Sequence, residues 1–416
     1  MKDSSIIDKV VSRRVFDSRG NPTIETEIIT KSGACGRAIS PSGASTGKKE
    51  AIEIRDNDKR YNGKDVKKGL TLIDKEITNL LIGLSCEDQA GFDKVLNDFD
   101  KTEQKKIIGG NVSTSLSIAN YLCACNLNKK PAFNYYGKSK DLKIPKPEIQ
   151  IFGGGAHSGN QNSFQDFLIY PINDFIYEEF LNSTHNIFNF AKEILINNNN
   201  FFGYCDEGGF YPNKLNQFDI CEIINESIIR NNMIPGKDIG ISIDVAASNF
   251  YSNKGYNLYD KIIDEVDLSI IFDKLISEFN VNIIEDPYHE EDFNSFATLK
   301  SKHDGYAKII GDDLVCSNYN LLKKALKNKS IDGIIVKINQ CGTISETLNT
   351  ISLAKKNKIK TILSARSGDT EEVFLSHFAV AWNLDMIKIG SFSRSERTSK
   401  WNELIRIDEE LNKFKI

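Results

Sequence analysis

The chain of 416 residues carries a formal net charge of −4, and 26% of its residues are charged. This length exceeds what one hydrophobic core usually organises, so we expect two domains. Charges of both signs are interspersed without a basic stripe, so the sequence indicates no nucleic-acid partner. No apolar stretch approaches the roughly 20 residues of a membrane span, so we expect none. The first residues, MKDSSIIDKV, lack the apolar core of a signal peptide, which favours the cytoplasm.

The first third of the chain predicts strands followed by helices. Residues 6–40 alternate apolar and polar side chains, most clearly in TIETEIIT, and the turn-rich segment DSRGNPT interrupts them. Helical periodicity follows over residues 66–84 and 113–127. A Lys/Pro-rich segment, KSKDLKIPKPEI, then separates this part from the rest. We therefore expect an N-terminal α+β domain over residues 1–142 and a second domain over residues 143–416.

Six short apolar runs in the second domain each end at a charged residue. Their intervals leave room for one helix and two loops after each strand, which is the pattern of a β/α barrel. Parallel barrel strands are buried on both faces, and barrel chemistry collects at their C-terminal ends. We therefore expect one rim to hold three carboxylates and three cations. The runs are IGISID, VNIIE, KIIGD, IIVK, TILSAR and MIK, and they end at Asp244, Glu285, Asp312, Lys337, Arg366 and Lys388.

A single charge at the end of a strand is often only the point where the chain returns to water. Six at regular spacing favour a metal site with a base beside it. A lysine inside IIVKIN or DMIKIG is costly to bury as an isolated charge, so each predicts an anionic partner or a lowered pKa. The competing interpretation is that the carboxylates only pair with the lysines.

Nine motifs of the chain resemble those of the enolase family, in the family's order. The resemblance implies a modified β/α barrel with a smaller N-terminal α+β domain, a homodimer or higher oligomer, and Mg²⁺-dependent dehydration of 2-phosphoglycerate to phosphoenolpyruvate in glycolysis. Two Mg²⁺ ions are expected for each active site, the second arriving with substrate. The motifs are DSRGNPT, PSGASTG, GGAHSGN, DEGGF, DVAAS, EDP, GDDL, VKINQ and SRSERTSKWNELIRIDEEL, covering nearly the whole chain.

The resemblance assigns roles to individual residues. Lys337 matches the base, which must be neutral when it takes the C2 proton of the substrate, so its pKa should be lowered. Lys388 should stay charged and hold the substrate carboxylate. Glu207 matches the general acid, with Asp166 as its partner. The ligands of Mg²⁺ are expected to be Asp244, Glu285 and Asp312, with Ser45 on a mobile loop, and the substrate-binding residues to be Ser45, His157, Gln165, Arg366 and Ser367.

Two positions depart from the family. Many enolases carry glutamate where this chain has Asp166, and the family sequence SHRSGET is replaced here by a segment in which Ala365 stands in place of the active-site histidine. Three interpretations remain open: an enolase with a modified phosphate corner, a paralogue acting on a different phosphorylated carboxylate, as the carboxyphosphonoenolpyruvate synthases do, and a non-catalytic relative with a binding role. His377 lies nearby in sequence, but it falls in a predicted helix and should not replace the missing imidazole. The resemblance also predicts that Arg19 pairs with Glu409 across the dimer two-fold axis.

Overall fold

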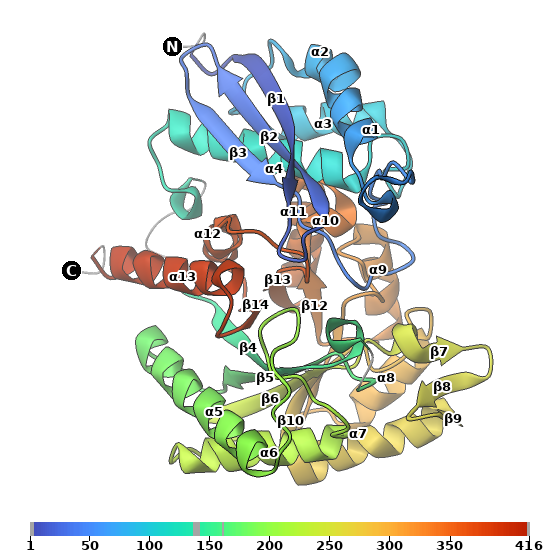
Figure 1. Ribbon diagram of the computed structural model, residues 1–416. Coiled ribbons are helices and arrows are strands. Elements are labelled where there is room, and N and C mark those ends of the chain that lie inside the picture. Colours follow the sequence, from blue (N-terminus) through green and yellow to red (C-terminus); the bar gives the residue numbers. More distant parts are fainter. Residues whose placement is uncertain (1–3, 136–141, 160–161, 414–416) are drawn as a thin grey trace.

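The structure is a computed structural model that describes residues 4–135, 142–159 and 162–413. Figure 1 shows a small sheet with helices, coloured blue to cyan, lying against a larger barrel that the rest of the chain forms. This arrangement confirms the predicted fold class. No helix among these residues is both long and apolar enough to cross a membrane.

The N-terminal sheet consists of β1 (Ile7–Phe16), β2 (Pro22–Thr30) and β3 (Cys35–Ile39), which pair in that order and antiparallel. Helices α3 (Gln89–Phe99) and α4 (Gly110–Leu127) follow, and α4 packs against β2 and β3. A Cβ on Gly36 would lie 2.1 Å from the backbone nitrogen of Cys123, so only glycine allows α4 to approach β3 this closely. The predicted helix over residues 66–84 is interrupted: α1 (Lys67–Leu72) and α2 (Thr78–Leu81) are joined by one π-helical turn, Ile73–Ile77.

Eight strands close into a barrel. Around it, β10, β11, β12, β13, β14 and β4 run parallel to one another and to β6, whereas β5 is antiparallel to both of its neighbours. This reversed strand is the modification of the regular β/α pattern. The strands are β4 (Lys146–Gly153), β5 (Asp166–Pro171), β6 (Ile239–Asp244), β10 (Val281–Glu285), β11 (Lys308–Gly311), β12 (Gly333–Val336), β13 (Lys360–Ser364) and β14 (Met386–Ser391).

Helices connect the strands of the barrel. A small antiparallel sheet of β7 (Tyr251–Ser252), β8 (Gly255–Leu258) and β9 (Lys261–Ile263) is inserted between β6 and α7, which explains the long interval between Asp244 and Glu285. The helices are α5 (Tyr177–Asn197), α6 (Gln217–Arg230), α7 (Glu265–Phe279), α8 (Phe293–Lys302), α9 (Tyr319–Asn328), α10 (Ile338–Cys341), α11 (Ile344–Lys356), α12 (Phe374–Ala381) and α13 (Ser395–Lys413).

The six predicted strands are present, with small differences at four ends: β11 and β12 each end one residue before the predicted charge, and the other two differ as follows. Arg366 lies two residues beyond the end of β13, and Lys388 lies inside β14, which continues to Ser391 through a register shift between Lys388 and Gly390. The predicted domain boundary at residue 142 adjoins residues 136–141, which fall outside the described part of the chain, so that boundary stays a prediction.

The N-terminal part is joined to the barrel by buried polar contacts. Asp93 of α3 accepts hydrogen bonds from the backbone nitrogen of Ser345, at 2.9 Å, and from Ser117 of α4. Ser117 in turn accepts one from the backbone nitrogen of Ile344, at 3.0 Å. These acceptors satisfy amides at the start of α11, where a helix leaves its first amides without internal partners.

Candidate active site

The predicted carboxylates and lysines converge at one rim of the barrel. Asp244 and Glu285 end β6 and β10, which pair in register at these two residues. The ammonium of Lys388 lies between them, 2.9 Å from Asp244 Oδ2 and 2.8 Å from Glu285 Oε2. Burial would lower the pKa of Lys388, but these two carboxylates raise it well above its ordinary value. Lys388 is therefore held as a cation, as expected for a group that binds a carboxylate.

Lys337, the first residue after β12, forms an ion pair with Asp312, the first residue after β11. Burial would lower the pKa of Lys337, but the charge of Asp312 raises it to about 12. This direction is opposite to that expected for a base. The physical reason is that the negative charge of Asp312 stabilises the protonated form of Lys337. Another cation would have to neutralise Asp312 before Lys337 could give up its proton easily.

The carboxylates of this rim are suited to a divalent cation. Burial, and next the charge of Asp244, raise the pKa of Glu285 well above its ordinary value, and Glu285 Oε1 is buried without a hydrogen-bond partner among the described residues. Hard oxygen donors with unbalanced negative charge fit Mg²⁺. In this structure the three predicted ligands pair with lysines, Asp244 and Glu285 with Lys388 and Asp312 with Lys337. Within the described residues, the groups that bring three possible ligand atoms within 4.8 Å of one another are Asp286, Asp312 and Asp313, and His157, Asp166 and Glu207.

The reversed strand β5 explains how Asp166 reaches the same rim. Because β5 is antiparallel to β6, its first residue, Asp166, pairs with Asp244 at the end of β6. Gln165, just before β5, donates to Asp244 Oδ2 at 3.0 Å. Parallel strands of a barrel present only their C-terminal ends at this rim, so the reversal adds a strand start to the site.

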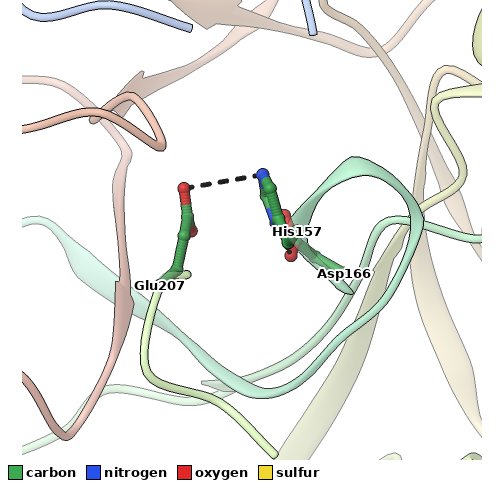
Figure 2. A group of neighbouring side chains, drawn as sticks. All are labelled: His157, Asp166 and Glu207. Carbon is green, nitrogen blue, oxygen red and sulfur yellow. Dashed lines mark hydrogen bonds and ion pairs between the residues drawn. The ribbon is translucent and has the colours of Figure 1, made fainter. Parts of the chain in front are cut away.

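His157 lies between two carboxyl groups, as Figure 2 shows. Its Nδ1 is 2.9 Å from Asp166 Oδ1, and its Nε2 is 3.8 Å from Glu207 Oε1. Burial would lower the pKa of His157, but the charges of Asp166 and Glu207 raise it to about 9. Burial alone would raise the pKa of Asp166, yet His157 and Lys388 hold it well below its ordinary value. Burial raises the pKa of Glu207.

The two carboxyl groups are therefore driven toward different protonation states. His157 and Lys388 lower the pKa of the Asp166 carboxyl group, whereas burial raises the pKa of the Glu207 carboxyl group. A pair of titratable groups whose environments separate their pKa values is a common arrangement for acid and base assignments. The roles of Glu207 as general acid and Asp166 as its partner stay predictions, which the proposal below takes up.

Arg366 and Ser367 lie beside the loop of residues 41–47. The Arg366 guanidinium contacts Glu50, at 3.0 Å, and the carbonyl of Ser45, at 3.1 Å. Ser367 Oγ accepts a hydrogen bond from the backbone nitrogen of Ala44 at 2.7 Å. The loop is thus held over the predicted phosphate-binding pair.

The cavity between this loop and the barrel rim is small. It holds about 20 Å³, which is room for one water molecule, and Ser45, Ala365, Lys337, Lys388 and Glu207 are among its lining residues. A phosphorylated substrate needs far more space than this, so groups that line the cavity have to shift when substrate enters; that the loop is the part that moves stays a prediction.

The glycines of the loop have a packing role that the sequence did not indicate. Gly43 and Gly47 belong to the loop that carries Ser45. A Cβ on Gly43 would lie 2.0 Å from the Arg366 guanidinium, and one on Gly47 would lie 2.7 Å from Cys316 Sγ. Both glycines are therefore needed for the close approach of the loop to the barrel.

Ala365 lies beside the predicted phosphate-binding residues. Ala365 is buried and lines the cavity beside Arg366 and Lys388. His377, on α12, stacks on Phe133 with ring centroids 5.9 Å apart and pairs with Glu403 at 3.1 Å. His377 does not line this cavity. Its position therefore agrees with the expectation that it does not replace the family histidine.

Several residues of the site were not singled out from the sequence. Asp286 accepts the backbone amides of Asp312 and Asp313, at 2.9 and 2.7 Å, and so orients the turn after β11. Gln340 donates to Asp312 Oδ1 at 2.8 Å. Arg397 donates to the carbonyls of Arg366 and Ser367, at 2.8 and 2.7 Å. Each lies within one of the recognised motifs, EDP, VKINQ and SRSERTSKWNELIRIDEEL. Membership of these motifs was the signal that could have identified the three residues.

Comparison with known proteins covers both parts of the chain. Residues 7–136 match the family described as "Enolase, N-terminal domain", and residues 141–415 match "Enolase, C-terminal TIM barrel domain". The chain belongs to the enolase family. Similar proteins include an enolase of Lactobacillus helveticus, 38% identical over 98% of this chain and 96% of its own length, and an enolase of Ehrlichia canis, 37% identical over 98% of this chain and 97% of its own.

Membership of the enolase family assigns an enzymatic activity to this site. An enolase is a phosphopyruvate hydratase, a carbon–oxygen lyase that dehydrates 2-phosphoglycerate to phosphoenolpyruvate, and this chain is such a lyase. Its substrate is a small phosphorylated carboxylate. This assignment favours the first of the three interpretations of the sequence over the paralogue and the non-catalytic relative.

Proposed function

We propose that this enolase removes the C2 proton of 2-phosphoglycerate with Lys337 and expels the C3 hydroxyl with the help of Glu207. The observation that carries the proposal is the separation of protonation states at one rim: Lys388 is held charged, Asp166 is held as an anion and burial favours protonated Glu207. Lys388 would hold the substrate carboxylate, and Arg366 with Ser367 would hold the phosphate.

The proposed cofactor is Mg²⁺, two ions for each site, with Asp244, Glu285 and Asp312 as the residues that would hold the first and Ser45 contributing to the second. Bound there, Mg²⁺ would supply positive charge where the substrate carboxylate gains a second negative charge on loss of the C2 proton. Within the chain, Lys337 would then take the proton at C2, and Glu207 would deliver a proton to the leaving oxygen.

Removal of divalent cations tests this proposal. We expect treatment with excess EDTA to abolish formation of phosphoenolpyruvate from 2-phosphoglycerate, and titration with Mg²⁺ to restore it, because three converging carboxylates would otherwise repel the charge that develops on the substrate. Metal-free protein to which Mg²⁺ is returned in full serves as the control for irreversible damage. Full turnover in excess EDTA would contradict the proposed role of the cation.

Restoring the family histidine at Ala365 tests the first interpretation, an enolase whose phosphate-binding region is modified at this residue. Ala365→His is expected to raise turnover of 2-phosphoglycerate by about an order of magnitude, because the imidazole adds a donor near the substrate phosphate and leaving group. The measurement is kcat with 2-phosphoglycerate, together with the melting temperature, because the added ring has to fit into a cavity of about 20 Å³. If the site is shaped for another phosphorylated carboxylate, the ring fills needed space and the turnover of that substrate falls. The double variant with Asp166→Glu shows whether the two positions act independently.

We also propose that the protein is a cytoplasmic homodimer, with an N-terminal domain over residues 1–142 and a catalytic domain over residues 143–416. Within one chain, Arg19 Nε lies 3.2 Å from Asp206 Oδ2, so the pairing with Glu409 requires Arg19 to turn toward a partner subunit. Glu409 is exposed on α13, so its side chain is accessible to a partner subunit.

Charge reversal at Glu409 tests the proposed interface. Glu409→Arg is expected to shift the protein toward monomer in sedimentation velocity, more strongly at low protein concentration, because a two-fold interface contains each pair twice. Glu222→Arg, an exposed position on α6, is the control with the same change in net charge. A dimer that is equally stable in both variants would place the interface elsewhere.

A further inference from the structure

A buried glutamine connects the two acidic side chains on the leaving-group side of the site. Gln150 lies on β4, and its side chain is fully buried. Its Nε2 donates to Asp166 Oδ1, and its Oε1 accepts a hydrogen bond from the backbone nitrogen of Gly209 at 2.9 Å. Cys205 Sγ donates to the same Oε1 at 3.4 Å. One side-chain amide thus joins the carboxylate of Asp166 to the turn that carries Glu207.

The backbone around this amide is shaped to admit it. A Cβ on Gly209 would lie 2.5 Å from Gln150 Oε1, and a Cβ on Gly153 would lie 3.1 Å from Gln150 Nε2 and 2.2 Å from Cys205 Sγ. Any larger residue at either position would displace the amide or its neighbours. Gly208, directly before Gly209, has a φ of +92°, a backbone conformation that favours glycine.

We propose that Gln150 is a positioning residue that fixes the separation between the Asp166 carboxylate and the turn that holds Glu207. The proposal rests on the function proposed above. Asp166 is one methylene shorter than the glutamate that many enolases carry, and Gln150 bonds the same oxygen, Oδ1, that His157 bonds at 2.9 Å. The glutamine therefore holds the short carboxylate in reach of His157, which stands 3.8 Å from Glu207.

We call the Gln150 side chain, with its bonds to Asp166 and to the turn of Glu207, the brace. It should affect departure of the C3 hydroxyl and not abstraction of the C2 proton. Lys337 lies at the end of β12 and pairs with Asp312, whereas Gln150 bonds Asp166, Gly209 and Cys205. A displacement near 1 Å of a group that works by position costs about 100-fold in rate. Loss of the brace should therefore misplace the acid side of the site and leave the base in place.

The first experiment compares two steps of the reaction in Gln150→Met, which keeps the length of the side chain but removes its donor and acceptor. We expect kcat for dehydration to fall about 10- to 100-fold, while exchange of the C2 proton of 2-phosphoglycerate with solvent stays within about threefold of wild type. Gln89→Met is the matched control, since Gln89 is a buried glutamine that donates to Asp93 at 2.9 Å in the N-terminal part. A merely structural role would lower both rates together, or neither, and would overturn the proposal.

The second experiment exchanges one methylene between the two partners. Gln150→Asn shortens the brace, and Asp166→Glu lengthens the carboxylate by the same unit. We expect the double variant to dehydrate 2-phosphoglycerate faster than Gln150→Asn alone, because the span from residue 150 to residue 166 is restored. Additive losses in the two single variants would contradict a brace between these residues.

A third measurement does not depend on activity and so separates this proposal from the proposed function. NMR of histidine-labelled protein gives the titration midpoint of His157, which faces Asp166 on β5, Glu207 on the turn and Asp244 at the end of β6. In Gln150→Met, Asp166 loses one of its hydrogen-bond donors, so the midpoint of His157 should move by at least about half a pH unit, with no change in Gln89→Met. An unchanged midpoint overturns the brace, whatever substrate the protein converts.

Discussion

Replacing Lys337 with alanine is expected to stop both dehydration of 2-phosphoglycerate and exchange of its C2 proton with solvent. Lys337 is the largely buried amine, 12% exposed, that we assign as base, and removal of a positioned general base costs about 10²- to 10⁴-fold in rate. The measurement is proton NMR of the substrate in deuterium oxide, which follows loss of the C2 signal, together with an assay for phosphoenolpyruvate.

Glu207→Gln gives the complementary result. The amide is nearly isosteric with the carboxyl group but delivers no proton to the leaving oxygen, so dehydration should fall by a similar factor while C2 exchange is partly retained. Because the base acts before the acid, the two variants separate the steps. Equal loss of exchange in both variants would show that the division of roles between these residues is wrong.

Lys388→Met is expected to lower kcat by about 10³-fold. The variant removes the ammonium that lies within 2.9 Å of Asp244 and Glu285 and leaves those buried carboxylates without its charge. It also removes the group that holds the substrate carboxylate as its negative charge increases. A lower melting temperature in the absence of Mg²⁺ should accompany the kinetic loss, and added Mg²⁺ should reduce that thermal effect, because the cation provides part of the missing counter-charge.

The control is Lys360→Met, because Lys360 begins the neighbouring strand β13 and pairs with Asp385 at 2.9 Å, yet lies at the opposite end of the barrel. It removes the same charge from the same barrel and should leave kcat unchanged. If Lys388→Met retained turnover within tenfold of wild type, Lys388 would not be the residue that holds the substrate carboxylate.

The barrel could be predicted because its strands are buried on both faces. Continuous apolar runs ending in Asp244, Glu285 and Asp312 mark the strand ends to within one residue, and the geometry of parallel strands then places these carboxylates on one rim. The direction of β5 could not be predicted in this way. A short buried strand has the same composition in either direction, and only its pairing with β4 and β6 shows that Asp166 begins the strand at the active rim.

The electrostatics of the site could be predicted only in part. The carboxylates beside Lys388 raise its pKa although burial lowers it, and burial raises the pKa of Glu207; the motifs suggested both settings. The pairing of Lys337 with Asp312 reverses the expected direction for Lys337, because the sequence does not give the distance between the two side chains. Gln150 was missed for a related reason: its partners, Asp166 and Gly209, lie on other segments, and no local pattern links the three.

Conversion of 2-phosphoglycerate by the purified wild-type protein, followed by phosphorus NMR, tests the central claim most directly. Phosphorus NMR observes substrate and product together, so it detects turnover even if Ala365 makes the enzyme slow. We expect phosphoenolpyruvate to form with Mg²⁺ present, and 2-phosphoglycerate to form from added phosphoenolpyruvate until the same ratio is reached from both sides. No interconversion in either direction, with the folded protein at high concentration and Mg²⁺ in excess, would contradict the assignment of this site as a phosphopyruvate hydratase.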